Sequence, residues 1–95
     1  MIYEWDGEKA ALNERKHAVP FDEAKTVFVD PLAETFDDPA HSHSEHRFIT
    51  LGRSSNQRLL FVAHADSGED RVRIISARVA TRGETYAYEE RSRKP

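Results

Sequence analysis

The clearest structural signal in the sequence is the stretch Arg71-Val72-Arg73-Ile74-Ile75-Ser76-Ala77-Arg78. Its alternation of polar and apolar residues is typical of a β-strand, in which successive side chains point to opposite faces of the sheet. One face would carry Val72, Ile74, Ser76 and Arg78, and the other Arg71, Arg73, Ile75 and Ala77. Because apolar residues occur on both faces, we expect the sheet to be covered on both sides near its centre.

Two further strands are predicted upstream of this one, over Arg47–Gly52 and Arg58–Ala65. The connections between the strands are short, which favours antiparallel hairpins over parallel crossovers. Ala33–Phe36 is a fourth candidate strand, and the polar residues from Asp37 to Glu45 form a loop after it. The sequence therefore predicts an antiparallel meander of three or four strands.

Helices are predicted before and after the meander in the sequence. Tyr3–Trp5 forms a short N-terminal strand, after which Asp6 caps a helix that runs to about Lys16. Pro20 starts a second helix, and Asp30-Pro31 ends it. A capping box, Thr81 to Glu84, begins a C-terminal helix that runs to about Glu90. We expect an α+β fold with two N-terminal helices packed on the antiparallel sheet.

The composition excludes several classes of protein. A chain of 95 residues is expected to form one domain over residues 1–95, and without cysteine it has neither disulfides nor a thiolate zinc site. Acidic residues near Met1 argue against a signal peptide, and no apolar run approaches the roughly 20 residues of a membrane-spanning helix. We therefore expect a cytoplasmic protein without a membrane partner.

The net charge of −3 hides two halves of opposite sign. Residues 1–46 hold four Lys or Arg against 11 acids, whereas residues 47–95 hold ten against six. The acidic average excludes nonspecific coating of nucleic acid, but the basic half favours a local anionic partner. The alternative is a solvated basic face without a partner.

The run His41-Ser42-His43-Ser44-Glu45-His46 contains weak candidate metal ligands, namely His41, His43 and His46. The spacing is not that of a structural zinc site, and nothing in the sequence fixes a third ligand rigidly. We therefore expect no physiological metal, and a solvated loop that captures metals adventitiously.

Asn13, Lys16 and His17 lie together at the end of the first predicted helix. A histidine can carry a proton near neutral pH and a lysine can hold a phosphate, and metal-independent RNA cleavage needs both functions. The alternative is a helix C-terminus at which basic residues complement the macrodipole.

The last strand and helix supply a second group of candidates: Arg71, Arg73, Arg78, Arg82, Glu84 and Tyr88. Guanidinium groups suit phosphodiesters because they can donate two parallel hydrogen bonds. Alternatively, Arg78 and Glu84 form a purely structural ion pair. Tyr88 is a candidate to stack on a base or donate a proton, or else it lies on the apolar face of the last helix.

Two blocks of sequence together resemble the BrnT family of bacterial toxins, nearly end to end. The first block comprises Tyr3-Glu4-Trp5-Asp6, Lys9, Asn13, Lys16-His17, Val19, Phe21, Glu23-Ala24, Phe28 and Asp30-Pro31. The second comprises Arg73-Ile74-Ile75-Ser76-Ala77-Arg78, Ala80-Thr81, Glu84 and Tyr88. Glu45 and Arg47 fall where the family usually has Glu-x-Arg.

The resemblance implies a RelE-like fold and a cofactor-free endoribonuclease that arrests translation. It implies neutralisation by a BrnA-type antitoxin, whose ribbon-helix-helix part binds DNA, in a complex of two toxins and two antitoxins. By position, Lys16, His17, Arg78 and Glu84 are the catalytic candidates, and the supporting RNA-binding candidates are Arg47, Arg73, Arg82 and Tyr88.

This sequence departs from the family at two positions. Ala18 stands where the family prefers glycine, and Gly83 replaces a usual basic residue. Two other functions remain open: a non-catalytic module that binds an acidic antitoxin segment, and a metal protein built on the histidine loop.

Overall fold

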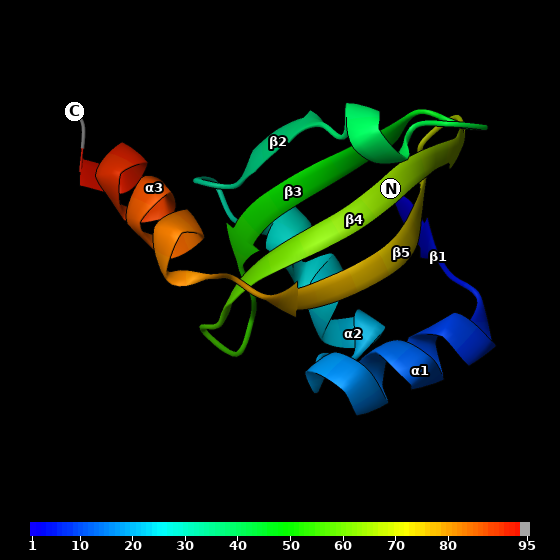
Figure 1. Cartoon of the computed structure of the whole chain (residues 1–95), viewed down its shortest axis with the longest axis horizontal. Helices are drawn as coiled ribbons and strands as arrows, with labels where there is room; N and C mark the ends of the chain where they lie inside the picture. Colours follow the sequence, from blue (N-terminus) through cyan, green and yellow to red (C-terminus); the bar gives the residue numbers. More distant parts are fainter. Residues whose placement is uncertain (94–95) are drawn as a thin grey trace.

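The fold is a five-stranded sheet with helices before and after its main strands (Figure 1). We describe residues 1–93 of a computed structural model. Its elements are β1 (Ile2–Glu4), α1 (Gly7–His17), α2 (Phe21–Ala24), the 3₁₀ helix η1 (Lys25–Val29), β2 (Glu34–Asp37), the 3₁₀ helix η2 (Pro39–His41), β3 (Arg47–Arg53), β4 (Leu59–Gly68), β5 (Arg71–Val79) and α3 (Arg82–Arg93). This arrangement confirms the predicted α+β class.

The sheet has the order β1-β5-β4-β3-β2. Strands β2 to β5 form the predicted antiparallel meander, but β1 pairs with β5 in parallel, with Ile2 opposite Arg71. The sheet is therefore mixed and larger than the three or four antiparallel strands expected. The pairing of β1 could not be predicted because a three-residue strand carries no local signal for its partner.

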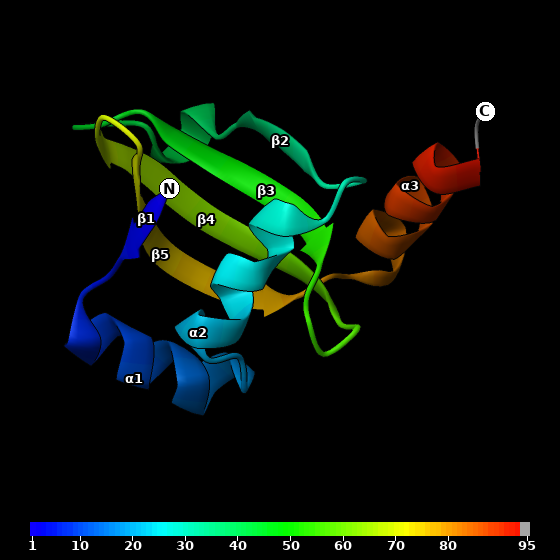
Figure 2. The ribbon, with the colours of Figure 1, turned by 180° about the vertical axis from the view of Figure 1, so that it is seen from behind.

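Helices cover one face of the sheet (Figure 2). The buried cluster on that face contains Val19, Phe21, Ala24, Val27, Leu60, Val62, Ile74 and Ala77. Trp5 packs against this cluster and meets the ring of Phe21 edge to face, with ring centroids 5.9 Å apart. The other side of the sheet, which we call the open face, is covered at one end by α3, whose Tyr88 packs on Leu51 and Leu59 (Figure 1). The expectation of cover on both sides is therefore met only in part, because α3 covers one end of this face rather than its centre.

A β-bulge in β5 changes which side chains reach the open face. Ala63 pairs with Ser76, but the next residue, His64, pairs with Ile74, so Ile75 is an extra residue. Val72, Ile74 and Ala77 are consequently buried on the helix side, whereas Arg78 lies on the open face. The prediction that Arg78 shares a face with Val72 and Ile74 was wrong, because strict alternation fails at a bulge.

The second predicted helix has the expected limits but two geometries. It begins after Pro20 as α2 and continues from Lys25 as η1, which ends before Asp30. The change coincides with the β-branched residues Thr26, Val27 and Val29, which lower helix propensity.

The end of α1 keeps a left-handed conformation at Ala18, with φ 57° and ψ 35°. A glycine would adopt it more readily, since the left-handed region costs other residues about 1–2 kcal/mol. The Ala18 carbonyl accepts a hydrogen bond from Arg58, which also binds the buried carboxylate of Glu23 through two nitrogens at 2.6 and 2.9 Å. These hydrogen bonds from Arg58 lower the pKa of Glu23 to about 2 and hold the end of α1 in place.

The side chain of Asn13 joins α1 to the edge of β5. Its amide donates to the carbonyl oxygens of Ala77 and Val19, at 2.9 and 3.1 Å, and its carbonyl oxygen accepts from the Ala77 nitrogen at 3.0 Å. Asn13 is buried, so these bonds satisfy backbone groups of β5 and of the α1–α2 connection that water cannot reach. Its role is structural rather than catalytic.

We expect Asn13→Ala to lower the free energy of unfolding by about 2–4 kcal/mol, because it leaves buried backbone groups of Ala77 and Val19 without partners. Urea denaturation of the variant measures this loss. Glu14→Ala, an exposed change on the same helix, is the control and should shift stability by less than about 0.5 kcal/mol. An Asn13→Ala protein as stable as the parent would contradict this role.

His64 is buried on the helix side of β4, between the rings of Phe28 and Phe48. Its Nε2 shares a 2.7 Å hydrogen bond with the Thr50 hydroxyl, and its buried Nδ1 has no hydrogen-bond partner among residues 1–93. Burial lowers the pKa of His64 to about 4.

His64 should make the protein less stable in weak acid. Below about pH 6.5 the imidazole of His64 binds a proton in the unfolded chain but stays neutral in the folded protein. The free energy of unfolding therefore falls as the pH drops toward 4, by at most about 3 kcal/mol. Glu23 adds a loss only below about pH 4.5, the ordinary pKa of its carboxyl group. Urea denaturation midpoints measured at pH 7.5 and pH 5 test this expectation. The drop in midpoint between the two pH values should be smaller in His64→Gln than in the parent protein, and an equal drop in both proteins would refute it.

Candidate active site on the open face

Arg78 and Glu84 form a two-pronged ion pair where β5 leads into α3. Arg78 Nη1 donates to Glu84 Oε1 at 2.8 Å and Nη2 donates to Oε2 at 3.0 Å. Glu84 also accepts from the Thr81 nitrogen, and its own nitrogen donates to the Thr81 hydroxyl, which confirms the predicted capping box. The hydrogen bonds that Arg78 donates to Glu84 lower the pKa of Glu84 and raise the pKa of Arg78, so both groups are charged.

The guanidinium group of Arg78 is further held by an aromatic ring. Its Cζ lies 3.9 Å from the ring centroid of Phe61, a cation–π contact with the neighbouring strand β4. Of its five N–H groups, two donate to Glu84 and one to the carbonyl of Val79. About one third of the side chain is exposed, so the remaining donors can meet a ligand on the open face.

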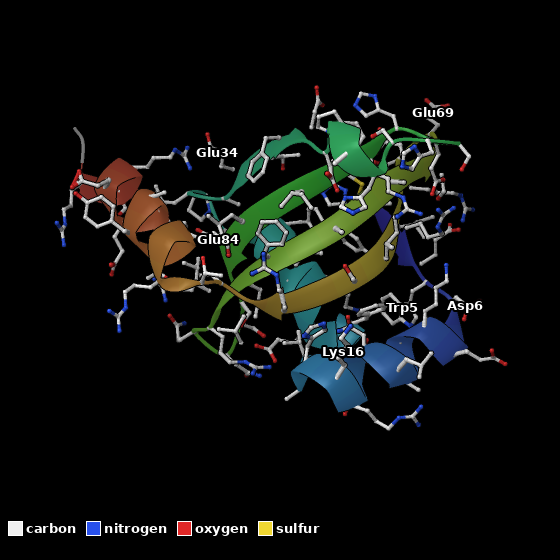
Figure 3. The ribbon with its side chains drawn as sticks, viewed as in Figure 1. Trp5, Asp6, Lys16, Glu34, Glu69 and Glu84 are labelled. Atoms are coloured by element: carbon white, nitrogen blue, oxygen red, sulfur yellow. The ribbon has the colours of Figure 1, made fainter. Side chains whose placement is uncertain are left out.

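Lys16 and His17 lie beside the same strand. They line a hollow of about 230 Å³ together with Ile75 and Ser76, which precede Arg78 on β5. Lys16 is exposed and His17 is half-buried. In Figure 3 the labelled Lys16 stands near the end of α1 and Glu84 at the start of α3, with the end of β5 between them. The structure thus brings the four catalytic candidates to one end of β5.

Arg47 and Arg73 lie at the other end of the open face. Both contact the carboxylate of Glu45: Arg73 donates a hydrogen bond to Glu45 Oε1, and Arg47 Nε lies 3.5 Å from that oxygen. Arg73 and Arg47 pair across Ala65, whereas Arg78 pairs with Phe61, four residues along β4. At about 3.3 Å per residue the two basic groups are about 13 Å apart along the strand.

The remaining RNA-binding candidates lie outside this arrangement. Arg82 is exposed on the first turn of α3. Tyr88 is only 5% exposed and packs against Leu51 and Leu59, and its hydroxyl donates to Asp30 at 2.7 Å. Stacking of a base on Tyr88 does not fit this burial, because its ring and its hydroxyl are both used within the fold.

The histidine loop does not assemble a metal centre. His41 pairs with Asp38 and His46 with Asp37, while His43 shares a surface hollow with the His46–Asp37 pair. Residues 1–93 contain no group of three or more His, Cys, Asp or Glu side chains that could hold a metal ion. The weak metal-ligand candidates therefore have no support in the geometry.

Phe61 is a further candidate site residue that sequence reasoning missed. An aromatic residue in a predicted strand normally indicates core packing, and only its place on the open face beside Arg78 reveals another role. No signal in the sequence could have found it without the register of β4 and β5.

The open face of this α+β fold presents two basic groups that carboxylates hold in place, and a lysine and a histidine lie beside the strand that carries one of them. Such a face is suited to bind a polyanion such as nucleic acid. The model of a family described as "Ribonuclease toxin, BrnT, of type II toxin-antitoxin system" matches residues 5–84. The chain therefore belongs to the BrnT family of ribonuclease toxins, as the sequence resemblance predicted.

A solved structure supports the fold independently. The chain is similar to the Brucella abortus ribonuclease toxin BrnT, with a TM-score of 0.67 and 21% identity over 86% of this chain and 100% of the Brucella chain. A search of curated proteins found no match. Over residues 1–93, none of the helices is long and apolar enough to cross a membrane.

We expect Tyr88→Phe to lower the free energy of unfolding by about 1–3 kcal/mol, because it removes a hydrogen bond to a charged carboxylate. Affinity for RNA should stay unchanged. Thermal denaturation and RNA binding measured on the same sample check both expectations, with the exposed Tyr86→Phe as control. Weaker RNA binding without a loss of stability would restore the binding role of Tyr88.

Proposed function

We propose that the protein is a metal-independent endoribonuclease that cleaves single-stranded RNA by attack of the RNA's own 2′-hydroxyl. The observation that carries this proposal is the Arg78 guanidinium, which Glu84 and the Phe61 ring hold at the end of β5. Lys16 and His17 line a hollow with Ser76, two residues before Arg78 on the same strand. In the step, the 2′-oxygen forms a bond to phosphorus, the bond to the 5′-oxygen breaks, and a proton moves from the 2′-hydroxyl toward the leaving oxygen.

The geometry favours a division of roles among the four candidates. Arg78 and Lys16 would stabilise the charge on the phosphorane, because fixed cations lower the energy of a developing anion. Both oxygens of Glu84 already accept hydrogen bonds and its pKa is lowered, which makes it a weak base. We therefore assign proton transfer to His17 and treat Glu84 as a positioning residue for Arg78.

The biological setting completes the proposal. We infer that residues 1–95 act as one RelE-like domain in the cytoplasm, and that a BrnA-type antitoxin neutralises it in a complex of two toxins and two antitoxins. An acidic antitoxin segment would be attracted to the basic groups of the open face and would block the site. Contact with DNA would then occur only through the antitoxin's ribbon-helix-helix part.

One observation also favours a non-catalytic module. Arg78 and Glu84 neutralise each other at hydrogen-bond distance, which is the geometry of a structural tie between a strand and a helix. If this ion pair has only a structural role, the protein would bind the antitoxin without cleaving RNA.

Arg78→Ala should reduce the rate of RNA cleavage by about 100- to 1,000-fold, the usual cost of removing one fixed stabiliser of a transition-state charge. The measurement is cleavage of an end-labelled single-stranded RNA by purified protein in excess EDTA, with growth arrest of a bacterial host as a second readout. Arg91→Ala removes an equal charge from α3 and serves as the control.

Three outcomes of this experiment separate the functions. Cleavage in EDTA that depends on Arg78 supports the proposal. Equal cleavage by the parent and Arg78→Ala would remove Arg78 from the mechanism, and cleavage only with added metal would contradict metal independence. Antitoxin binding without any cleavage would identify the non-catalytic module.

A further inference from the structure

A second hollow lies on the open face between the two basic groups. Across the sheet, Ile49, Ala63 and Ser76 are paired neighbours on β3, β4 and β5. This row falls between the row that holds Arg78 and Phe61 and the row that holds Arg47 and Arg73. A ligand in the hollow would therefore have a guanidinium group on each side along the strands.

The hollow is small, more enclosed than the hollow beside Lys16, and mixed in chemistry. Its volume is about 150 Å³, below the roughly 300–1,000 Å³ of pockets for drug-sized ligands, so it suits a single small ring system. Its lining is apolar along the sheet and polar at the rim: Ile49, Phe61, Ala63, Ile75, Ser76, Arg47, Asp38 and His41. An apolar surface with a few polar groups at its edge is typical of sites that bind aromatic ligands.

The rim is held rigidly by the loop that follows β2. Both carboxylate oxygens of Asp38 lie within hydrogen-bond distance of His41 Nδ1, at 3.0 and 3.1 Å. The backbone nitrogen of Asp38 donates to the Arg47 carbonyl at 2.9 Å. The Ser42 hydroxyl donates to the Asp38 carbonyl and accepts from the Arg47 nitrogen. The Asp38 carboxylate therefore has a fixed place at the edge of the hollow.

The rim carries both the Asp38 carboxylate and the Arg47 guanidinium, and the carboxylate discriminates between the possible occupants. A carboxylate repels a phosphate and also an acidic side chain of an antitoxin, so neither suits the hollow itself. A neutral base would place its ring on the apolar lining and its amino group near Asp38, while its flanking phosphates would lie toward the arginines. Arg47 also lines the hollow; its buried Nε has no hydrogen-bond partner among residues 1–93, and the nearest carboxylate oxygen, Glu45 Oε1, lies 3.5 Å away.

We propose that this hollow is a nucleobase-binding subsite for single-stranded RNA, and that Asp38 makes it prefer a base with an exocyclic amino group over uracil. The inference rests on the proposed function, since it names a subsite of the same RNA-binding face. Cytosine donates from its N4 amino group to a carboxylate, whereas uracil has a carbonyl oxygen at the equivalent position.

The subsite can be tested by binding alone, without cleavage. The probes are short 2′-O-methyl oligocytidines, which lack the attacking hydroxyl, either intact or with one abasic residue placed at each position in turn. Fluorescence anisotropy should show that one abasic position weakens binding to the parent protein by about 10- to 100-fold. Loss of base stacking at the hollow is the reason for this effect.

Ala63→Leu fills the hollow, and Ala63→Ser is the matched control that leaves its volume nearly unchanged. The filled variant should bind the intact oligomer about as weakly as the abasic one, whereas the control should behave as the parent protein. Asp38→Asn, which preserves the shape of the rim, should remove most of an approximately tenfold preference for cytosine over uracil. This second variant keeps the test valid if Ala63→Leu fails to fold.

The outcomes of the experiment are distinct. Equal binding of intact and abasic oligomers by the parent protein would overturn the subsite. So would an Ala63→Leu variant that loses affinity for the antitoxin but keeps its preference for intact RNA, because the hollow would then be a protein-binding site. Base-dependent binding together with failure to cleave unmodified RNA would refute the proposed catalysis and leave the subsite in place.

Discussion

The contact between the Asn13 side chain and the backbone of Ala77 sets the geometry of the site. Strand β1 pairs with β5 only from Arg71 to Arg73, so within residues 1–93 the rest of that sheet edge has no neighbouring strand. Asn13 takes the place of a strand there, because its amide both donates to and accepts from Ala77. The last turn of α1 is thereby fixed against β5, and the exposed Lys16 and half-buried His17 line one hollow with Ser76.

The bulge at Ile75 has an equally specific consequence. Without the extra residue, Arg78 would fall on the same face as Ile74, under the helices, where a buried charge is costly unless it is fully paired. The bulge lets one strand contribute Ile74 and Ala77 to the core and Ser76 and Arg78 to the open face. A strand that carries both core and site residues needs such a break in its alternation.

Local signals predicted most of the secondary structure, and nonlocal pairing was the part they missed. The caps at Asp6 and at Thr81 and Glu84 could be recognised because their hydrogen bonds span only two or three residues. The parallel pairing of β1, the bulge and the unequal helical cover of the two sheet faces depend on partners far along the chain. The same limit applies to the site: the sequence supplied Arg78 and Glu84, but the role of Phe61 follows from register alone.

The arrangement of charges explains how a protein with net charge −3 can present a face suited to the proposed RNA substrate. Glu45 and Glu84 neutralise Arg73 and Arg78 in the average, yet each pair fixes a guanidinium group and leaves some of its donors free. A fixed guanidinium loses little conformational entropy when it binds a phosphate, whereas a mobile lysine on a uniformly basic surface must be ordered first. Such a face gains affinity from the position of its cations rather than from their number, which favours a substrate whose phosphates and bases match that spacing over nucleic acid in general.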